Sequence, residues 1–220
     1  MKSGAGCAFT ECRDMYYLIF YGVDMLLWSA ALILTLLVIV LISGHRLSFA
    51  QKIWILILAL YLAAVYNVAG APELPYIYPN FNVNLIPFVD IRSDVCAYII
   101  NSGLNIILFL PLGFILPLLW SRFRSRKRII LTGFLFSLAI ELSQLLNYRI
   151  TDVDDLIMNS LGTWLGYELL MFFHRRSSKG LLLSSADSGR RQFTVVVLAV
   201  VLVMFALRPY ITAWVAEIML

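Results

Sequence analysis

The residues of this chain that could take part in chemistry are concentrated between positions 141 and 166. This segment holds carboxylates, an arginine and amides inside and between two apolar stretches. An ionisable group in a membrane segment costs about 2.5–3.5 kcal/mol on insertion scales, so such groups usually face a partner or a wet cavity. Together with one amide from an earlier stretch, the candidate ligand-binding residues are Asn105, Glu141, Gln144, Arg149, Asp152, Asp155 and Asn159.

These side-chain types limit the chemistry of the site. Carboxylates and amide carbonyls suit Mg²⁺, Ca²⁺ or Mn²⁺, arginine suits phosphate or carboxylate groups, and two carboxylates can exchange protons. The only histidines, His45 and His174, are expected on the opposite side of the membrane, which argues against a Ser-His-acid hydrolase. The chain has no P-loop, Rossmann or zinc motif. We therefore expect no cofactor, and leave open a divalent cation at Asp152, Asp154 and Asp155.

The elements that must position these groups are transmembrane helices. Of the 220 residues, 61% are hydrophobic and 14% charged, whereas soluble domains are nearer half apolar and a quarter charged. Six predominantly apolar runs have about the 17–25 residues that a membrane-spanning helix needs. They cover residues 25–42, 53–69, 98–120, 129–146, 156–173 and 193–215. We expect an all-α polytopic bundle, in which Arg208 and Pro209 leave open whether the last run crosses fully or turns along the interface.

The basic residues predict the orientation of this bundle. Twelve of the 17 lysines and arginines follow the first, third and fifth runs. Because membrane proteins keep such loops in the cytoplasm, both termini and the loops at 70–97 and 147–155 are expected outside. The same rule accounts for the run RFRSRKR at 122–128, so we expect no nucleic-acid partner.

Helix geometry predicts that three candidate residues share one layer. At a rise of about 1.5 Å per residue, Asn105, Glu141 and Asn159 lie roughly 10, 9 and 6 Å below the outer ends of their helices. Gly162 and Gly166 continue the face of Asn159 and allow a neighbouring helix to approach closely. The amide and carboxylate groups are therefore expected to face one another inside the bundle.

Some of these residues also have purely structural interpretations. Asp152 and Asp154 could serve only to begin the helix that follows them, because acids stabilise a helix N-terminus. Glu141 would be either protonated or paired with Arg149 or an amide, since burial disfavours its charge.

Two further features bear on the architecture. The aromatic- and proline-rich loop at 70–95 is either a structured connector or a lid over a lipid-facing site. Pro111 and Pro117 predict a bend in the third helix, because proline removes a hydrogen bond and clashes with the preceding turn.

Four ordered motifs resemble the VanZ-like family. They are NLIPF at 84–88, NIILFLPLG at 105–113 followed by Pro117, ExxQ at 141–144, and RxxDxDDxxxNxxGxxxG at 149–166. The resemblance covers about residues 53–173, so we expect an N-terminal segment at 1–52, a core at 53–173 and a C-terminal addition at 174–220. It implies a bacterial membrane protein from a family whose founding member is associated with resistance to teicoplanin, a glycopeptide directed at cell-wall precursors.

Our leading hypothesis is a multi-pass protein of the bacterial cytoplasmic membrane with an outward-facing polar pocket. The pocket would bind a membrane lipid, a lipid-linked cell-wall precursor or a lipophilic glycopeptide. One alternative is a carboxylate-dependent hydrolase or transferase that acts on an isoprenoid-linked substrate. Another is a carrier in which Glu141 titrates, although the inner halves of the core helices are nearly all apolar.

Overall fold

The protein is all-α apart from one pair of very short strands, in the part of the chain that the structure describes. The computed structural model describes residues 19–35, 37, 47–69, 77, 79, 83–92, 94–146, 151–177, 181–183 and 189–219. Its helices are Ile19–Thr35, α2 (Phe49–Val68), α3 (Val95–Leu119), α4 (Arg126–Gln144), α5 (Val153–Arg176), α6 (Gly189–Leu202) and α7 (Arg208–Met219). Short 3₁₀ turns lie at Val89–Arg92 and Ser121–Phe123.

Described helices occupy parts of all six predicted positions, and three of them are long and apolar enough to cross a membrane. These are α2, α3 and the continuous helix Gln192–Ile218, which α6 and α7 form together. The helix Ile19–Thr35 is apolar but shorter. α4 and α5 carry more polar and charged residues, including those of the candidate site. The protein is thus a helical membrane protein, and its six crossings and its orientation remain predictions.

The chain passes Pro209 without leaving the helix. Proline has no amide hydrogen, and its ring clashes with the carbonyl four residues earlier. A π-helical turn at Val203–Leu207 widens the helix at this point, and the Arg208 N–H donates to the Val203 carbonyl, five residues back. The last apolar run is therefore one helix with a local bulge.

α3 likewise continues through Pro111 and Pro117. Near the first proline, the Tyr61 hydroxyl of α2 donates to the Leu108 carbonyl at 2.7 Å. Beyond the second, the Arg124 Nε donates to the carbonyl of Pro117 itself at 3.0 Å. Side chains from outside the helix thus bind carbonyls in the region where the prolines weaken its own ladder.

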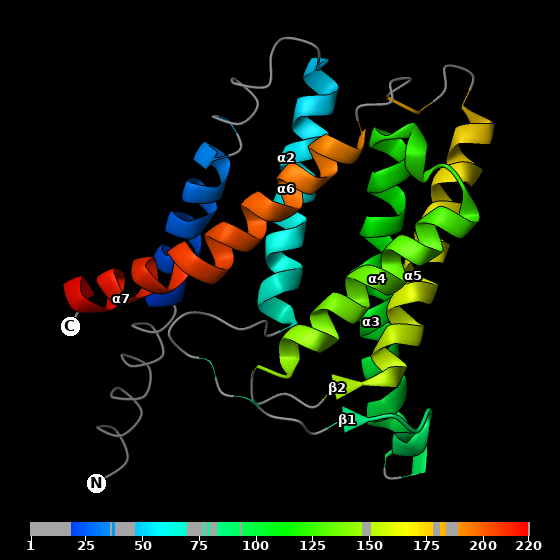
Figure 1. Ribbon diagram of the computed structural model, residues 1–220, viewed down its shortest axis with the longest axis horizontal. Coiled ribbons are helices and arrows are strands. Elements are labelled where there is room, and N and C mark those ends of the chain that lie inside the picture. The colour runs from blue at the N-terminus through cyan, green and yellow to red at the C-terminus, as the bar shows by residue number, and fades with distance from the viewer. Residues whose placement is uncertain are drawn as a thin grey trace, which may run out of the picture.

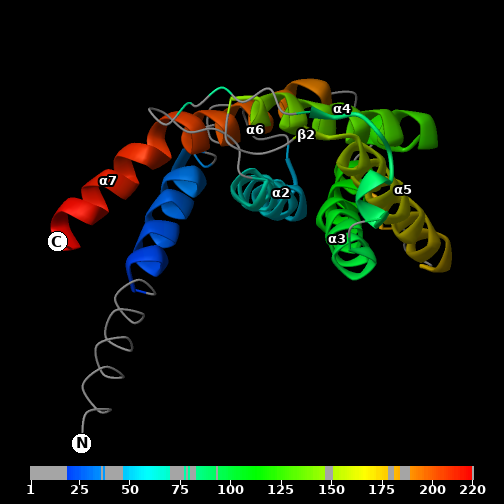
Figure 2. The same cartoon turned by 90° about the horizontal axis from the view of Figure 1, so that it is seen from below.

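The helices form two layers, seen in Figures 1 and 2. α4 and the joined helix α6–α7 lie across the layer made by Ile19–Thr35, α2, α3 and α5. The 3₁₀ turn Ser121–Phe123 and the start of α4 lie at one end of the bundle, which we call the basic end. The short strands β1 (Val83–Asn84) and β2 (Thr151–Asp152) lie at the other, the strand end. The apolar core includes Leu58, Leu62, Phe109, Leu116, Val200 and Met204.

The first described helix is joined to the last by a polar contact. Asp24 is buried, and the Thr212 hydroxyl donates to its Oδ1 at 2.6 Å. A buried acidic side chain within an apolar helix is costly without a partner. This contact therefore couples Ile19–Thr35 to α7.

Candidate functional site

The close pairing of α3 with α5 positions the candidate site. A Cβ atom placed on Gly162 would overlap the Ile106 carbonyl, and one on Gly166 would overlap the Leu110 carbonyl. From the other side, a Cβ on Gly113 would overlap the Thr163 carbonyl. The predicted close approach at the glycine pair is thus confirmed, and it brings α3 against the face of α5 that carries Asn159.

Three helices then contribute to one polar cluster near the strand end. It consists of Asn84, Asn105, Ser137, Glu141, Gln144, Asp152, Asp154, Asp155 and Asn159, and this set is called the polar cluster below. The Asn105 side chain of α3 donates to the Asp155 carboxylate of α5. The Asn159 side chain of α5 donates to the Ser137 hydroxyl of α4 at 2.9 Å. The predicted meeting of polar groups from α3, α4 and α5 is therefore present.

Glu141 is the middle one of the three residues that α4 contributes to the polar cluster. Its side chain is 1% exposed, and its Oε2 accepts the backbone N–H of Asp152 at 3.0 Å. Its own backbone carbonyl accepts the Thr151 hydroxyl at 3.1 Å. Glu141 therefore holds strand β2 and the start of α5 against α4. Arg149, the partner proposed for it, lies outside the described residues.

Asp152 is the N-cap of α5, as the structural interpretation of this residue predicts. Its Oδ1 accepts the backbone N–H of Asp154 at 2.9 Å, and its Oδ2 accepts the Asn84 side-chain amide at 3.2 Å. β1 and β2 pair in parallel here, with Val83 opposite Thr151 and Asn84 opposite Asp152. Asp152 thus begins the helix and also ties it to the loop before α3.

Asp154 does more than begin a helix. It is buried, and both of its carboxylate oxygens lie 3.0 Å from the backbone nitrogen of Phe88. Phe88 has a φ of 63°, a left-handed conformation that is unfavourable for a bulky side chain. The charge-assisted hydrogen bond to Asp154 stabilises that turn. The segment 83–88 is therefore a structured connector bound to the start of α5.

Gln144 points to a different neighbour from Glu141. Its Nε2 donates to the Ala69 carbonyl at the end of α2, at 3.0 Å, and the side chain is buried. Gln144 thus connects α4 to α2, whereas Asn105, Asp155 and Asn159 connect α3, α4 and α5.

Two buried oxygen atoms in the polar cluster accept no hydrogen bond from the described residues. Among the described residues, no hydrogen-bond donor reaches Gln144 Oε1 or Asn159 Oδ1, although both side chains are only 4% exposed. A buried polar atom without a partner costs about 1–3 kcal/mol. These two amides are therefore the places where the cluster could accept a donor from a ligand.

Sequence reasoning did not single out Ser137. It lies four residues before Glu141 on α4, so helical spacing places both on one face, and its hydroxyl also lies 3.5 Å from the Asp155 carbonyl. The four-residue spacing from Glu141 is the feature of the sequence that could have identified Ser137 as part of the polar cluster.

The three aspartates of the proposed cation site have separate partners. Asp152 caps α5, Asp154 accepts from Phe88 and Asp155 accepts from Asn105. No group of three or more His, Cys, Asp or Glu side chains within the described ranges is arranged to hold a metal ion.

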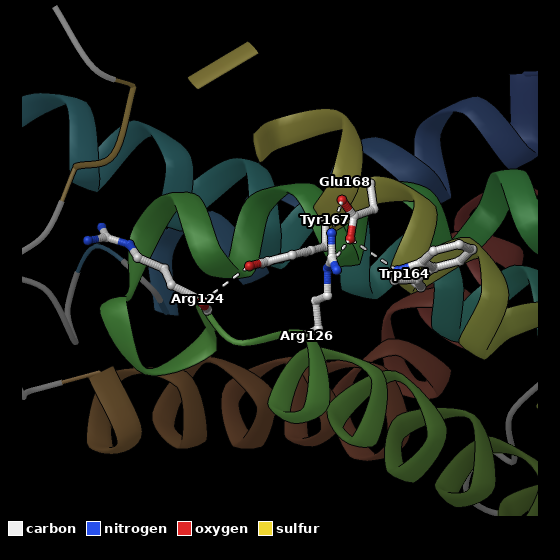
Figure 3. A network of polar contacts seen from close by, with 5 residues as sticks. All are labelled: Arg124, Arg126, Trp164, Tyr167 and Glu168. Carbon is white, nitrogen blue, oxygen red and sulfur yellow. Dashed lines mark hydrogen bonds and ion pairs between the residues drawn. The ribbon is translucent and has the colours of Figure 1, made fainter. Parts of the chain in front are cut away.

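A second polar network lies at the basic end and is shown in Figure 3. Arg126 and Glu168 form an ion pair with N–O distances of 2.6 and 3.1 Å, and the Trp164 Nε1 donates to the same carboxylate at 3.2 Å. The Tyr167 hydroxyl donates to the Arg124 carbonyl at 3.2 Å. Burial lowers the pKa of the Arg124 guanidinium from its ordinary value. This network fastens the α3–α4 turn to α5.

Comparison with family models places the core helices in a known family. The model described as VanZ/LLP1 matches residues 49–174, which include α2, α3, α4, all but the last two residues of α5 and every residue of the polar cluster. Comparisons with curated proteins and with solved structures gave no significant match. The match covers more than half of the chain and includes the four motifs on which the resemblance was based. This apolar helical membrane protein therefore belongs to the VanZ/LLP1 family.

Proposed function

We propose that this protein is a multi-pass protein of the bacterial cytoplasmic membrane whose polar cluster binds the head of an amphiphile from the outer leaflet. The ligand would be a membrane lipid, a lipid-linked cell-wall precursor or a lipophilic glycopeptide such as teicoplanin. The observation that carries the proposal is the presence of buried amide acceptors without described donors, Gln144 Oε1 and Asn159 Oδ1, beside the buried Glu141.

The chemistry of the cluster favours ligands that donate hydrogen bonds. The buried acceptors that lack described donors, Gln144 Oε1 and Asn159 Oδ1, are amide oxygens, which accept from hydroxyl, amide N–H and ammonium groups. Sugars and peptides supply such donors, and both occur in wall precursors and glycopeptides. Arg149 would add a bidentate grip on a phosphate or carboxylate of the same ligand.

The apolar surface beside the cluster supports a ligand with a hydrocarbon part. On the first half of α3, Ile100, Leu104 and Ile107 are 55%, 57% and 66% exposed, next to the half-buried Asn105. In a bilayer this face would lie against lipid chains. A head group could therefore reach Asn105 and Asp155 while its chain stays in the membrane.

The test uses Glu141→Gln, which preserves the size of the side chain and one carbonyl acceptor for the Asp152 N–H. Purified protein would be titrated with an undecaprenyl-linked wall precursor and with teicoplanin, and host cells would be scored for teicoplanin susceptibility. We expect Glu141→Gln and Arg149→Ala to weaken binding roughly 10- to 100-fold, as for a lost hydrogen bond to a charged group.

The matched control is Glu168→Gln, which removes one carboxylate charge at the basic end and leaves the polar cluster intact. It should bind like the unmodified protein. The proposal is wrong if Glu141→Gln and Arg149→Ala, expressed at normal levels, leave both ligand binding and susceptibility unchanged.

A further inference from the structure

A long apolar groove lies on the other side of α4, between α2 and α6. Its volume is about 770 Å³, within the range of about 300–1,000 Å³ that is typical of ligand sites. Its walls include Leu62 and Val65 from α2, Leu135 and Ala139 from α4, and Val197 and Val200 from α6. None of the residues that line it belongs to the polar cluster.

The groove has the length and access that a lipid chain requires. It follows α4 from Arg128 to Ser143, and fifteen residues of helix rise about 22 Å. Leu131 and Leu135 on its rim are 56% and 53% exposed, so the groove is open to the surrounding membrane along its side. A hydrocarbon chain could enter sideways without any helix moving.

Two arginines mark one end of this groove, Arg122 and Arg128. The Arg128 Nη1 donates to the Arg122 carbonyl at 3.3 Å, which keeps the two residues together. In the described part of the chain, neither guanidinium forms an ion pair with a carboxylate, since the one ion pair found there joins Arg126 to Glu168. Both arginines are exposed and both line the groove.

The four arginines of the run at 122–128 are therefore divided into two sets. Arg124 binds the Pro117 carbonyl. Arg126 forms the ion pair with Glu168 that Figure 3 shows. Arg122 and Arg128 keep their charge available at the mouth of an apolar groove. The positive-inside rule accounts for the presence of basic residues in this loop but not for this division.

We propose that the groove binds an anionic glycerophospholipid, with its phosphate at Arg122 and Arg128 and an acyl chain along α4. Guanidinium groups bind phosphate oxygens in a bidentate manner, and anionic lipids of the cytoplasmic leaflet attract basic residues close to the membrane surface. The phosphate would lie at the basic end and the acyl chain along residues of α4 that do not belong to the polar cluster, and the bound lipid would be structural or regulatory.

The test is native mass spectrometry of the full-length protein in neutral detergent, titrated with phosphatidylglycerol or with phosphatidylcholine of the same acyl chains. We expect phosphatidylglycerol to bind more tightly. The double variant Arg122→Gln, Arg128→Gln should lose roughly 30-fold in phosphatidylglycerol affinity, since each basic residue near an anionic head group is worth about a fivefold factor. Phosphatidylcholine binding should change little.

The matched control is Lys127→Gln with Arg175→Gln, which removes the same charge from the basic end but from residues that line a separate pocket. It should keep its preference for phosphatidylglycerol. Equal losses in the two double variants would overturn the proposal, because they would mean general surface attraction.

The apolar part of the site is tested separately by filling it. Ala139→Trp places a large side chain in the groove, and Ala97→Trp places one on an exposed face of α3 outside it. We expect Ala139→Trp to weaken the binding of both phosphatidylglycerol and phosphatidylcholine, and Ala97→Trp to weaken neither. Unchanged phosphatidylglycerol binding in a folded Ala139→Trp variant would also overturn the proposal, while Glu141→Gln, which tests the other site, should leave this binding unaltered.

Discussion

The contact between α3 and α5 leads to a quantitative prediction for Gly162→Ala. An added Cβ would overlap the Ile106 carbonyl, a backbone atom that cannot rotate away. Overpacking of this kind costs about 1–3 kcal/mol. Replacing a helical glycine by alanine also gains about 0.8–1.0 kcal/mol in helix propensity, so the packing cost has to be separated from that gain.

Gly103→Ala provides the separation. Gly103 lies on α3 as well, and a Cβ placed on it would have no neighbour within 4 Å. Both variants receive the propensity gain, so the difference between them is the packing cost alone, about 1–3 kcal/mol. For a chain of this size that corresponds to roughly 2–12 °C in Tm, at about 2–4 °C per kcal/mol.

The assay is thermal unfolding of the two variants and the unmodified protein in the same detergent, followed by circular dichroism. Gly103→Ala should melt at or above the unmodified protein, and Gly162→Ala should melt below Gly103→Ala by the stated interval. If the two alanine variants melt together, the close approach of α3 and α5 is not the constraint that the geometry indicates.

Three further predictions concern single contacts. Asp154→Leu should free the Phe88 N–H and destabilise the protein by about 1–3 kcal/mol, whereas Asp154→Asn keeps an acceptor and should lose less; limited proteolysis before α3 distinguishes them. Asp24→Ala with Thr212→Val in a double-mutant cycle should show coupling of about 0.6 kcal/mol, the average for such bonds in membranes; additive melting shifts would contradict it. Finally, purified protein with Mg²⁺ or Mn²⁺ should not hydrolyse a polyprenyl phosphate, and turnover abolished by Asp152→Asn would instead favour the enzyme alternative.

Helical periodicity was sufficient to predict the parts of the site that lie within helices. Counting residues from the helix ends predicts that polar side chains of α3, α4 and α5 meet, and the glycine pair predicts the close approach of α3. The single shared layer is not what the contacts show, because Asn105 binds Asp155, Asn159 binds Ser137 and Glu141 binds the Asp152 N–H. Both inferences depend on distances within one helix, which rise and pitch determine. The family assignment could be made for the same reason, because its motifs are local.

Contacts between distant segments could not be predicted in this way. The role of Asp154 depends on the backbone N–H of Phe88, 66 residues earlier. Every residue except proline has a backbone N–H, so the residue type does not indicate which one will bind the carboxylate. The division among the arginines of 122–128 depends on Glu168, which lies on a helix two elements later. Such partners follow from the packing of whole helices and become visible only in three dimensions.

The pairing of segment 83–88 with residues 151–154 has a consequence for the order of assembly. Because Phe88 binds Asp154 across 66 residues of sequence, the connector before α3 cannot acquire its final shape until the start of α5 has been synthesised. At about 5–20 residues per second, that interval lasts roughly 3–13 s. During this time α3 and α4 are synthesised while the connector is still unpaired, so the strand end should be the last region of the core to become resistant to protease during synthesis.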